Sequence, residues 1–424
     1  MSGALLPRPL RFPKPQRSEP ADSRRIAFIA PFGLRAKGTT RARVLPLARA
    51  LARLGHTLAV FIPPYDSPED SGRRWREAGV EVINVALPHA AVGPAWHAAL
   101  AWRLLRAVRA WQPDLVHAFK PKGPSGLVAT ALWLAPAGGL NRPPLVVDSD
   151  DWEGPGGWND DPRTGYSPLQ KRVFAWQERH GLSHAAAWTV ASECLRQRAV
   201  AFGAAPDRIF VLHNGVARGL EPPTQAGLAA VAAVSTAESP SAILYTRFAG
   251  VRADEVTAIW ARVRAARPDA HLMVVGRGVA GEERGLADVP GVTVAGWVEP
   301  AQLPEMLAAA QVALVPWDDT PPNRARHSAK VLELMAAGLP VVAYAVGELP
   351  ATLGDAGVLV APGDQAAFAR EVAALLADAE RRARLGAAAR ARVAERFTWE
   401  RLAHVALAAY DRAFGERAMR VCKG

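Results

Sequence analysis

The sequence predicts an α/β protein made of two Rossmann-like domains, whose mostly parallel sheets face a central cleft. Short apolar runs rich in β-branched residues alternate with helical patterns from residue 25 onward, and this alternation is typical of βαβ units. The alternation stops over a small, polar, proline-containing stretch at 217–240 and then restarts. A chain of 424 residues is also too long for a single hydrophobic core.

The first series of strands and helices runs from residue 25 to residue 216. Helices are expected at about 41–54, where Gly55 ends the helix, and at 96–111. Strands are expected, in chain order, in "RIAFIAP", "TLAVFIP", "VEVINV", "DLVHAF", "PPLVVDSD", "AAWTVAS" and "RIFVLHNG". Their apolar character fits parallel strands that are covered by helices on both faces.

The second series begins at residue 241 and follows the same alternation. Helices are expected at 253–266, near 301–310, in the segment that Gly338 ends, and over most of the chain beyond residue 364. Strands are expected in "SAILYTRF", "HLMVVGRG", "VTVAGWV", "VALVPW" and "PVVAY". Because open α/β sheets bind ligands at the carboxyl ends of their strands, a site is expected in the cleft between the two domains.

These patterns divide the chain into five parts. The predicted parts are a disordered, basic, proline-rich tail at 1–24, an N-terminal Rossmann-like domain at 25–216, a linker at 217–240, a C-terminal Rossmann-like domain at 241–398, and a C-terminal helix at 399–424 that packs back on the N-terminal domain. The tail lacks the apolar segment of a secretory signal.

The composition narrows the class of function. A net charge of +11 and a pI near 10.2 favour anionic partners, among them nucleotides, nucleic acids and anionic lipid surfaces. Nucleic-acid binding is not expected, because the arginines are scattered and no recognition module is legible. No run approaches the roughly 18 apolar residues of a membrane span. Cys194 and Cys422 form neither a disulfide framework nor a metal site, which fits a reducing cytoplasm.

The segment "GLRAKGTT" connects the first predicted strand to the first helix. Gly33 and Gly38 have the spacing of a phosphate-binding P-loop, but Thr39 stands where that loop needs its lysine. A kinase or NTPase is therefore not expected, and the absence of G-x-G-x-x-G argues against a dinucleotide oxidoreductase. Two interpretations remain, a plain βα turn or a close backbone approach to a ligand at Gly38 and Thr39.

His117 is expected at the carboxyl end of its strand, with Lys120 and Lys122 in the loop beyond. Strand ends of this kind face the cleft, which makes His117 and Lys120 candidates for the site. A single histidine in this position is about as often part of the core.

The segment "VVDSDDWEGPGGWND" crowds Asp150 and Asp151 at another strand end, beside Trp152 and Trp158. Sugar rings stack on aromatic faces, and their hydroxyls hydrogen-bond to carboxylates. The segment therefore predicts a sugar-binding region rather than a solvated loop. A divalent metal site is the less favoured alternative, because no histidine or further aspartate completes a ligand set.

In the second domain, Arg247 ends a strand and Arg252 follows in the turn into the next helix. Two guanidinium groups placed in this way could bridge a diphosphate through charge-assisted hydrogen bonds. The alternative is that both are ordinary surface arginines in an arginine-rich chain.

The segment "NRARHSAKVLELMAAGLPVVAY" contains a helix whose N-cap is expected to be Ser328. The free N–H groups at 328–331 suit a phosphate. Lys330 and Glu333 could simply pair with each other. However, Glu333 lies in an apolar stretch, where a carboxylate is costly to bury without a partner, and a ribose diol would supply one.

Several of these segments together resemble the retaining GT-B glycosyltransferases of family 4, also called glycosyl transferases group 1. "KVLELMAAGLPVVAY" resembles the family pattern E-x-M-A-x-G-x-P-V-V, and "TRFAGVRA" resembles G-R-L-x-x-x-K-G with Arg252 in the lysine position. The resemblance covers about residues 25–400 and is stronger in the second half. Further matches follow in the family's order, namely "HNGV", "VTVAGWV", "VALVPW" and "VGELPATLGDAGVLVAPGD".

The resemblance implies a cytoplasmic enzyme that moves a sugar from a nucleotide-sugar to an acceptor with retention of configuration. The nucleotide-sugar is a substrate, and neither a cofactor nor a metal is expected. The C-terminal domain would bind the donor and the N-terminal domain the acceptor. The implied donor residues are Arg247, Arg252, Gly296, Trp297, Val298, Ser328, Ala329, Lys330 and Glu333. The catalytic candidates are His117, Asp150 and Asp151, and the acceptor candidates are Gly38, Thr39, Lys120, Trp152 and Trp158.

Two departures from the family pattern bear on function. Ala325 stands where the family has the first glutamate of an E-x7-E pair, and that glutamate contacts the donor sugar. His117-Ala118-Phe119 stands where the family often has H-x-H. The identity of the donor sugar therefore stays open. Two alternative functions also stay open, a nucleotide-sugar epimerase or hydrolase and a catalytically silent sugar-nucleotide-binding protein. The basic N-terminal half also suggests peripheral contact with the inner face of the membrane and a lipid-linked acceptor.

Overall fold

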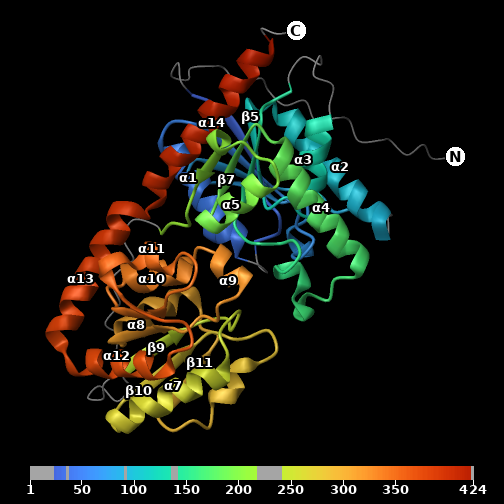
Figure 1. Cartoon of the computed structure of the whole chain (residues 1–424). Coiled ribbons are helices and arrows are strands. Elements are labelled where there is room, and N and C mark those ends of the chain that lie inside the picture. Colours follow the sequence, from blue (N-terminus) through green and yellow to red (C-terminus); the bar gives the residue numbers. More distant parts are fainter. Residues whose placement is uncertain (1–22, 35–37, 90–92, 135–141, 217–240, 422–424) are drawn as a thin grey trace.

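The computed structural model describes residues 23–34, 38–89, 93–134, 142–216 and 241–421. These residues form two α/β domains, each built around its own sheet (Figure 1). The predicted fold class is confirmed. The predicted linker at 217–240 lies outside the described residues, as does almost all of the predicted tail.

The N-terminal domain contains an eight-stranded sheet in the order β3-β4-β2-β1-β5-β6-β7-β8. All neighbouring strands are parallel except β3, which pairs antiparallel with β4. The strands are β1 (Arg25–Ile29), β2 (Thr57–Ile62), β3 (Arg74–Glu77), β4 (Val80–Asn84), β5 (Leu115–Phe119), β6 (Leu145–Ser149), β7 (Ala187–Val190) and β8 (Ile209–Val211).

Helices cover both faces of this sheet. One apolar core joins it to α2 (Gly93–Trp111), α3 (Pro124–Leu134), α4 (Pro168–His184) and α5 (Glu193–Ala201). A second core joins it to α1 (Leu45–Arg53) and α14 (Trp399–Val421). Short helical turns are η1 (Thr40–Val44), η2 (Pro68–Asp70), η3 (Trp158–Asp160), η4 (Pro162–Thr164) and η5 (Pro206–Arg208). In the described part of the chain, no helix is both long and apolar enough to cross a membrane.

The C-terminal domain contains a six-stranded, fully parallel sheet in the order β11-β10-β9-β12-β13-β14. Its strands are β9 (Ser241–Tyr245), β10 (His271–Val275), β11 (Val292–Gly296), β12 (Val312–Val315), β13 (Val341–Tyr344) and β14 (Val358–Val360). Its helices are α7 (Ala253–Ala266), α8 (Leu303–Ala308), α9 (Pro321–Ala325), α10 (Ala329–Ala336), α11 (Leu349–Leu353), α12 (Gln365–Ala377) and α13 (Ala379–Arg396), with the turns η6 (Glu282–Leu286), η7 (Pro300–Gln302) and η8 (Gly354–Ala356).

The chain returns to the N-terminal domain at its end. Helix α13 lies along the C-terminal domain, and α14 then runs back over α1, β7 and β8 (Figure 1). Tyr410 in the middle of α14 is fully buried. A backbone bridge between Val216 and Thr398 ties the two crossings between the domains together. The domains are therefore joined by two segments as well as by their contact surface.

Candidate active site between the two domains

A cavity of about 610 Å³ lies between the domains and is lined by both. From the N-terminal domain come the segments after β1, β5 and β6, which contribute Thr39, Lys120 and Asp150. From the C-terminal domain come the segment after β9, with Arg247, and the start of α10. The carboxyl ends of strands in both sheets thus meet at one cavity, as expected for open α/β sheets.

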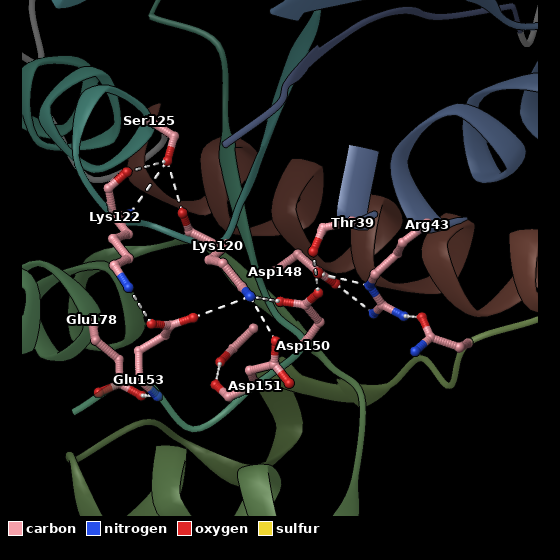
Figure 2. Close-up of polar contacts among 12 residues, drawn as sticks. Thr39, Arg43, Lys120, Lys122, Ser125, Asp148, Asp150, Asp151, Glu153 and Glu178 are labelled. Atoms are coloured by element: carbon pink, nitrogen blue, oxygen red, sulfur yellow. Dashed lines mark hydrogen bonds and ion pairs between the residues drawn. The ribbon is translucent and has the colours of Figure 1, made fainter. Parts of the chain in front are cut away.

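Lys120 is the centre of a buried charge cluster on the N-terminal side (Figure 2). Its Nζ lies 2.6 Å from Asp151 Oδ2, 3.0 Å from Glu153 Oε1 and 3.4 Å from Asp150 Oδ1. Lys122 Nζ lies 2.6 Å from the second oxygen of Glu153. Lys120 has a left-handed backbone (φ 46°), and its N–H donates to the carbonyl oxygen of Asp148 at 2.8 Å. This conformation, unusual for a residue with a side chain, directs Lys120 into the cluster.

The cluster sets the protonation of its members. Burial alone would lower the pKa of Lys120, but the surrounding carboxylates raise it well above its usual value. Burial disfavours the charge of Glu153, yet Lys120 and Lys122 together lower the pKa of this carboxyl to about 2. Burial raises the pKa of Asp151 to about 6, against the opposing effect of Lys120. Lys120 therefore stays charged, whereas the pKa of the Asp151 carboxyl lies above its usual range.

Arg43, which lines the cavity, forms a second buried ion pair with Asp148. The Arg43 guanidinium donates to Asp148 Oδ1 at 2.8 Å and to Oδ2 at 2.7 Å, and it donates to Asn214 Oδ1 at 3.0 Å. The side-chain amide of Asn214 in turn donates to the carbonyl oxygen of His327 at 2.6 Å. Because His327 directly precedes the Ser328 cap of α10, these contacts fix the start of that helix against the N-terminal domain.

The C-terminal side of the cavity is cationic. Ser328 caps α10 by accepting a hydrogen bond from the N–H of Val331 at 3.4 Å. Lys330 Nζ lies 4.2 Å from the centre of the Tyr245 ring, and Tyr245 hydrogen-bonds to Glu333. In the described chain, no carboxylate lies within ion-pair distance of the lining cations Arg247, Arg326 and Lys330.

The electrostatics of these groups reflect their burial. Burial lowers the pKa of Lys330, although Glu333 opposes this change, and it lowers the pKa of Arg326 to about 10. Burial also raises the pKa of the Glu333 carboxyl, and one of its oxygens is enclosed without a hydrogen bond from any residue that the structure describes. Cations without carboxylate partners beside a helix N-terminus form a surface that suits phosphate groups.

The structure brings many of the predicted residues together around the cavity. Those that line it are Gly38, Thr39, Lys120, Asp150, Asp151, Trp158, Arg247, Ser328, Ala329 and Lys330. Glu333 lies one turn deeper in α10 and reaches the cavity wall through Tyr245. What each residue does in the site stays a prediction.

The expectation that His117 faces the cleft is wrong. His117 lies in the middle of β5 and is fully buried, with Nδ1 2.9 Å from the Tyr410 hydroxyl and Nε2 3.0 Å from Thr189 Oγ1. This burial lowers its pKa well below the usual value. Both ring nitrogens form hydrogen bonds in the core beneath α14, and His117 does not line the cavity, so we no longer consider it a catalytic candidate.

Arg252 and Trp152 also lie away from the cavity. The Arg252 side chain is 55% exposed and pairs with Asp254, Glu255 and Asp318, so it is engaged by carboxylates. The Trp152 ring lies 4.1 Å from the Arg198 guanidinium, and its N–H donates to the carbonyl oxygen of Pro155. Neither side chain therefore lines the cavity, although Arg252 was expected to bind the donor and Trp152 the acceptor. Gly296 ends the edge strand β11 and Trp297 and Val298 follow it, and none of the three lines the cavity.

The position of Ala325 explains part of the departure from the family pattern. Ala325 ends α9, is fully buried and belongs to the apolar core of the N-terminal domain. Its neighbour Arg326 lines the cavity instead, with its guanidinium 3.8 Å from the centre of the Trp317 ring. The sequence analysis missed Arg326, although the basic run "RARH" around the absent glutamate could have indicated it.

Arg163 is another cavity residue that the sequence analysis missed. It pairs with Asp161 at 2.6 Å and, across the domain boundary, with Glu282 at 3.0 Å. No pattern in the sequence relates residues so far apart, so only the fold reveals this contact.

Both halves of the chain match models of known protein families. Residues 38–215 match the family model described as "Glycosyl transferase 4-like domain", and residues 250–378 match "Glycosyl transferases group 1". A D-inositol 3-phosphate glycosyltransferase of Segniliparus rotundus is 32% identical over 240 residues, which is 53% of this chain and 52% of that protein. A protein of the same name from Xylanimonas cellulosilytica is 40% identical over 29% of this chain and 28% of its own length. The matches thus span about half of the first relative and less than a third of the second.

Solved structures share the fold over nearly the whole chain. Sucrose-phosphate synthase from Thermosynechococcus elongatus has a TM-score of 0.69 at 22% identity, covering 92% of this chain and 99% of its own. HepE of Anabaena, solved in complex with UDP and glucose, has a TM-score of 0.65 at 16% identity over 90% of this chain and 97% of its own. At these identities the likeness concerns the fold.

Proposed function

The chain belongs to the family 4 glycosyltransferases of the GT-B fold, and we propose that it moves a sugar from a nucleotide-sugar to an acceptor inside the cavity between its domains. The observation that carries this proposal is the division of charge across the cavity. Cations that have no carboxylate partner among the described residues line the C-terminal side, and carboxylates paired with cations line the N-terminal side. The first surface suits a nucleoside diphosphate, and the second suits the hydroxyl groups of an acceptor.

The donor diphosphate is proposed to lie at the start of α10, between Arg247 and Lys330. The free N–H groups of the helix and the two side chains can all donate to phosphate oxygens. The ribose is proposed to contact Glu333, because its unpartnered carboxylate oxygen can accept a hydrogen bond from a ribose hydroxyl. This arrangement gives a buried acid in an apolar helix a binding role.

The proposed reaction retains the configuration of the sugar. The bond between the anomeric carbon and the phosphate oxygen breaks, and the bond to the acceptor oxygen forms on the same face. The departing phosphate takes the acceptor's proton, so no protein nucleophile is needed. Arg247, Lys330 and the N-terminus of α10 stabilise the charge that develops on the phosphate, and the proposal requires neither a metal nor a cofactor.

Two rival functions use the same donor site. An epimerase or hydrolase would act on the nucleotide-sugar itself, and product analysis with and without acceptor separates it from a transferase. A silent sugar-nucleotide-binding protein is favoured by Ala325, which leaves the usual sugar contact unfilled. Such a protein would bind the nucleotide but turn over no donor in the presence of any acceptor.

A lipid-linked acceptor is supported by one outer face of the N-terminal domain. On α4, Leu169, Val173 and Trp176 are 70%, 39% and 49% exposed at a spacing that places them on one side of the helix. Exposed basic residues, among them Arg172 and Arg179, accompany them. We propose that this face contacts anionic lipid, which places the enzyme on the inner face of the membrane. Vesicle flotation without salt-sensitive binding would exclude such contact.

The proposed function is tested first by the nucleotide. A thermal-shift screen of UDP, GDP, ADP and CMP and their sugars should show stabilisation by one base, because a ligand that binds only the folded state raises the melting temperature. The sugar-nucleotide found in this way is then incubated with acceptors, and transfer is measured. A protein that none of these nucleotides stabilises is not a nucleotide-sugar glycosyltransferase.

A further inference from the structure

We infer that the part of the acceptor that enters the cavity is an uncharged polyol and not a phosphorylated group. The inference rests on the proposed function and narrows the class of acceptor. It comes from the pairing of charges on the N-terminal side of the cavity and from two polar atoms there that lack hydrogen bonds.

The lining cations of the N-terminal domain all contact carboxylates in the part of the chain that the structure describes. Lys120 contacts Asp150, Asp151 and Glu153, and Lys122 contacts Glu153 (Figure 2). Two arginines are engaged in the same way, Arg43 by Asp148 and Arg163 by Asp161 and Glu282. None of these cations is left to bind an incoming phosphate.

The balance of charge on this side is negative. The four cations are accompanied by five carboxylates of the same domain, namely Asp148, Asp150, Asp151, Glu153 and Asp161. Burial lowers the pKa of Arg326 of the opposite domain and Asp151 partly opposes this change, but the two side chains lie beyond ion-pair distance in the described chain. A phosphate monoester on the acceptor would face these carboxylates, and every lining cation of the described N-terminal domain already contacts a carboxylate. Burying the phosphate charge against this surface is therefore costly.

A neutral hydroxyl fits the same surface. Asp150, which is 8% exposed, has an oxygen, Oδ1, that accepts no hydrogen bond from the residues that the structure describes and has only the 3.4 Å ion contact with Lys120. The indole N–H of Trp158 also has no acceptor among the described residues. Both residues line the cavity. The hydroxyls of a polyol can both donate to Asp150 and accept from Trp158, whereas an ammonium group could serve only Asp150 and an ionised phosphate only Trp158.

The test compares acceptors that differ only by a phosphate: glucose and glucose 6-phosphate, mannose and mannose 6-phosphate, and myo-inositol and its 1-phosphate. Transfer from the sugar-nucleotide that stabilises the wild-type protein is measured for each pair. The neutral member is expected to have a kcat/KM at least about tenfold higher, since a tenfold ratio corresponds to about 1.4 kcal/mol. Glu153→Gln should narrow this ratio several-fold, because it releases Lys120 and Lys122 from one carboxylate.

Two tryptophan variants test the proposed hydrogen bond between the Trp158 N–H and the acceptor. Trp158→Phe keeps an aromatic ring but removes the N–H, and it should raise the KM for the neutral acceptor several-fold while nucleotide affinity stays unchanged. Trp152→Phe alters a nearby tryptophan that does not line the cavity, and it should leave that KM unchanged. Equal KM values in wild type and Trp158→Phe would contradict the assigned contact.

The inference is overturned if the phosphorylated member of a pair is the better acceptor. It is also overturned if neither member of any pair accepts the sugar from a protein that binds the nucleotide. A protein that binds no nucleotide would instead contradict the proposed function, so the two failures are distinguishable.

Discussion

At the scale of the residue, the site is defined by which charges have partners. Glu333 could be recognised from the sequence because an acid in an apolar helix needs a partner, and the structure shows one of its oxygens without a hydrogen bond. For His117 and Arg252, the position in the structure differs from the one that the sequence suggested, and the reason is different. The face of a strand alternates at every residue, and a guanidinium can turn toward nearby acids, so position in the sequence does not fix where either side chain points.

Glu333→Ala and Arg247→Ala should each weaken nucleoside diphosphate binding by roughly 1–3 kcal/mol, because each removes a charged hydrogen bond. Titration calorimetry measures this loss. Arg252→Ala is the matched control, since Arg252 is engaged outside the cavity, and its affinity should equal that of the wild type. Unchanged affinity in both site variants would refute the donor-site assignment.

The low pKa of Glu153 makes a prediction about acid stability. Its carboxyl has a pKa of about 2 instead of 4.5, so its charge contributes stability above pH 4.5 that is lost as the pH falls toward 2. This contribution is on the order of 3 kcal/mol. Urea unfolding of Glu153→Gln between pH 4.5 and 2 should show a shallower dependence on pH than the wild type. Glu380→Gln, at an exposed position, should keep the wild-type dependence, and equal slopes in wild type and Glu153→Gln would contradict the prediction.

At the scale of the element, the sequence predicted most strands well because parallel strands buried on both faces are short, continuous apolar runs. It missed β3 (Arg74–Glu77), whose "RWRE" has no apolar run and pairs at the sheet edge. The helix that was expected after the Ser328 cap is α10, and the separate short helix α9 that precedes it was not predicted. The break between α9 and α10 places Ala325 in the N-terminal core and Arg326 in the cavity, a division that helical periodicity alone does not predict.

Ala325→Glu restores the family's residue but should not restore its contact. The new carboxylate would enter an apolar core, so we expect a loss of at least about 2 kcal/mol in the free energy of unfolding. Pro321→Glu, at the exposed start of the same helix, should cost less than about 1 kcal/mol. Denaturant unfolding compares the two, and a fully stable Ala325→Glu protein with tighter donor binding would show that α9 moves into the site.

At the scale of the whole molecule, the site exists only while the two domains are held together. The side-chain amide of Asn214 in the N-terminal domain donates a hydrogen bond to the carbonyl oxygen of His327, which directly precedes the Ser328 cap of α10, and α14 packs the end of the chain against the first sheet. These contacts join residues far apart in the sequence. The sequence could therefore predict a cleft but not which residues meet across it.

The ion pair between Arg163 and Glu282 spans the domains at the cavity. Arg163→Glu should open the domains, because it places like charges opposite each other, and small-angle X-ray scattering should show a larger radius of gyration. The double variant Arg163→Glu/Glu282→Arg should return toward the wild-type value. Identical scattering from all three proteins would mean that this pair does not hold the domains in place.

We propose that the cavity transfers a sugar from a nucleotide-sugar with retention of its anomeric configuration. The most direct test is to incubate the protein with the α-linked nucleotide-sugar that stabilises it and a neutral acceptor, and to determine the anomeric configuration of the product by NMR. We expect an α-linked product and one released nucleoside diphosphate per sugar transferred. A β-linked product, or an intact donor after prolonged incubation, would contradict it.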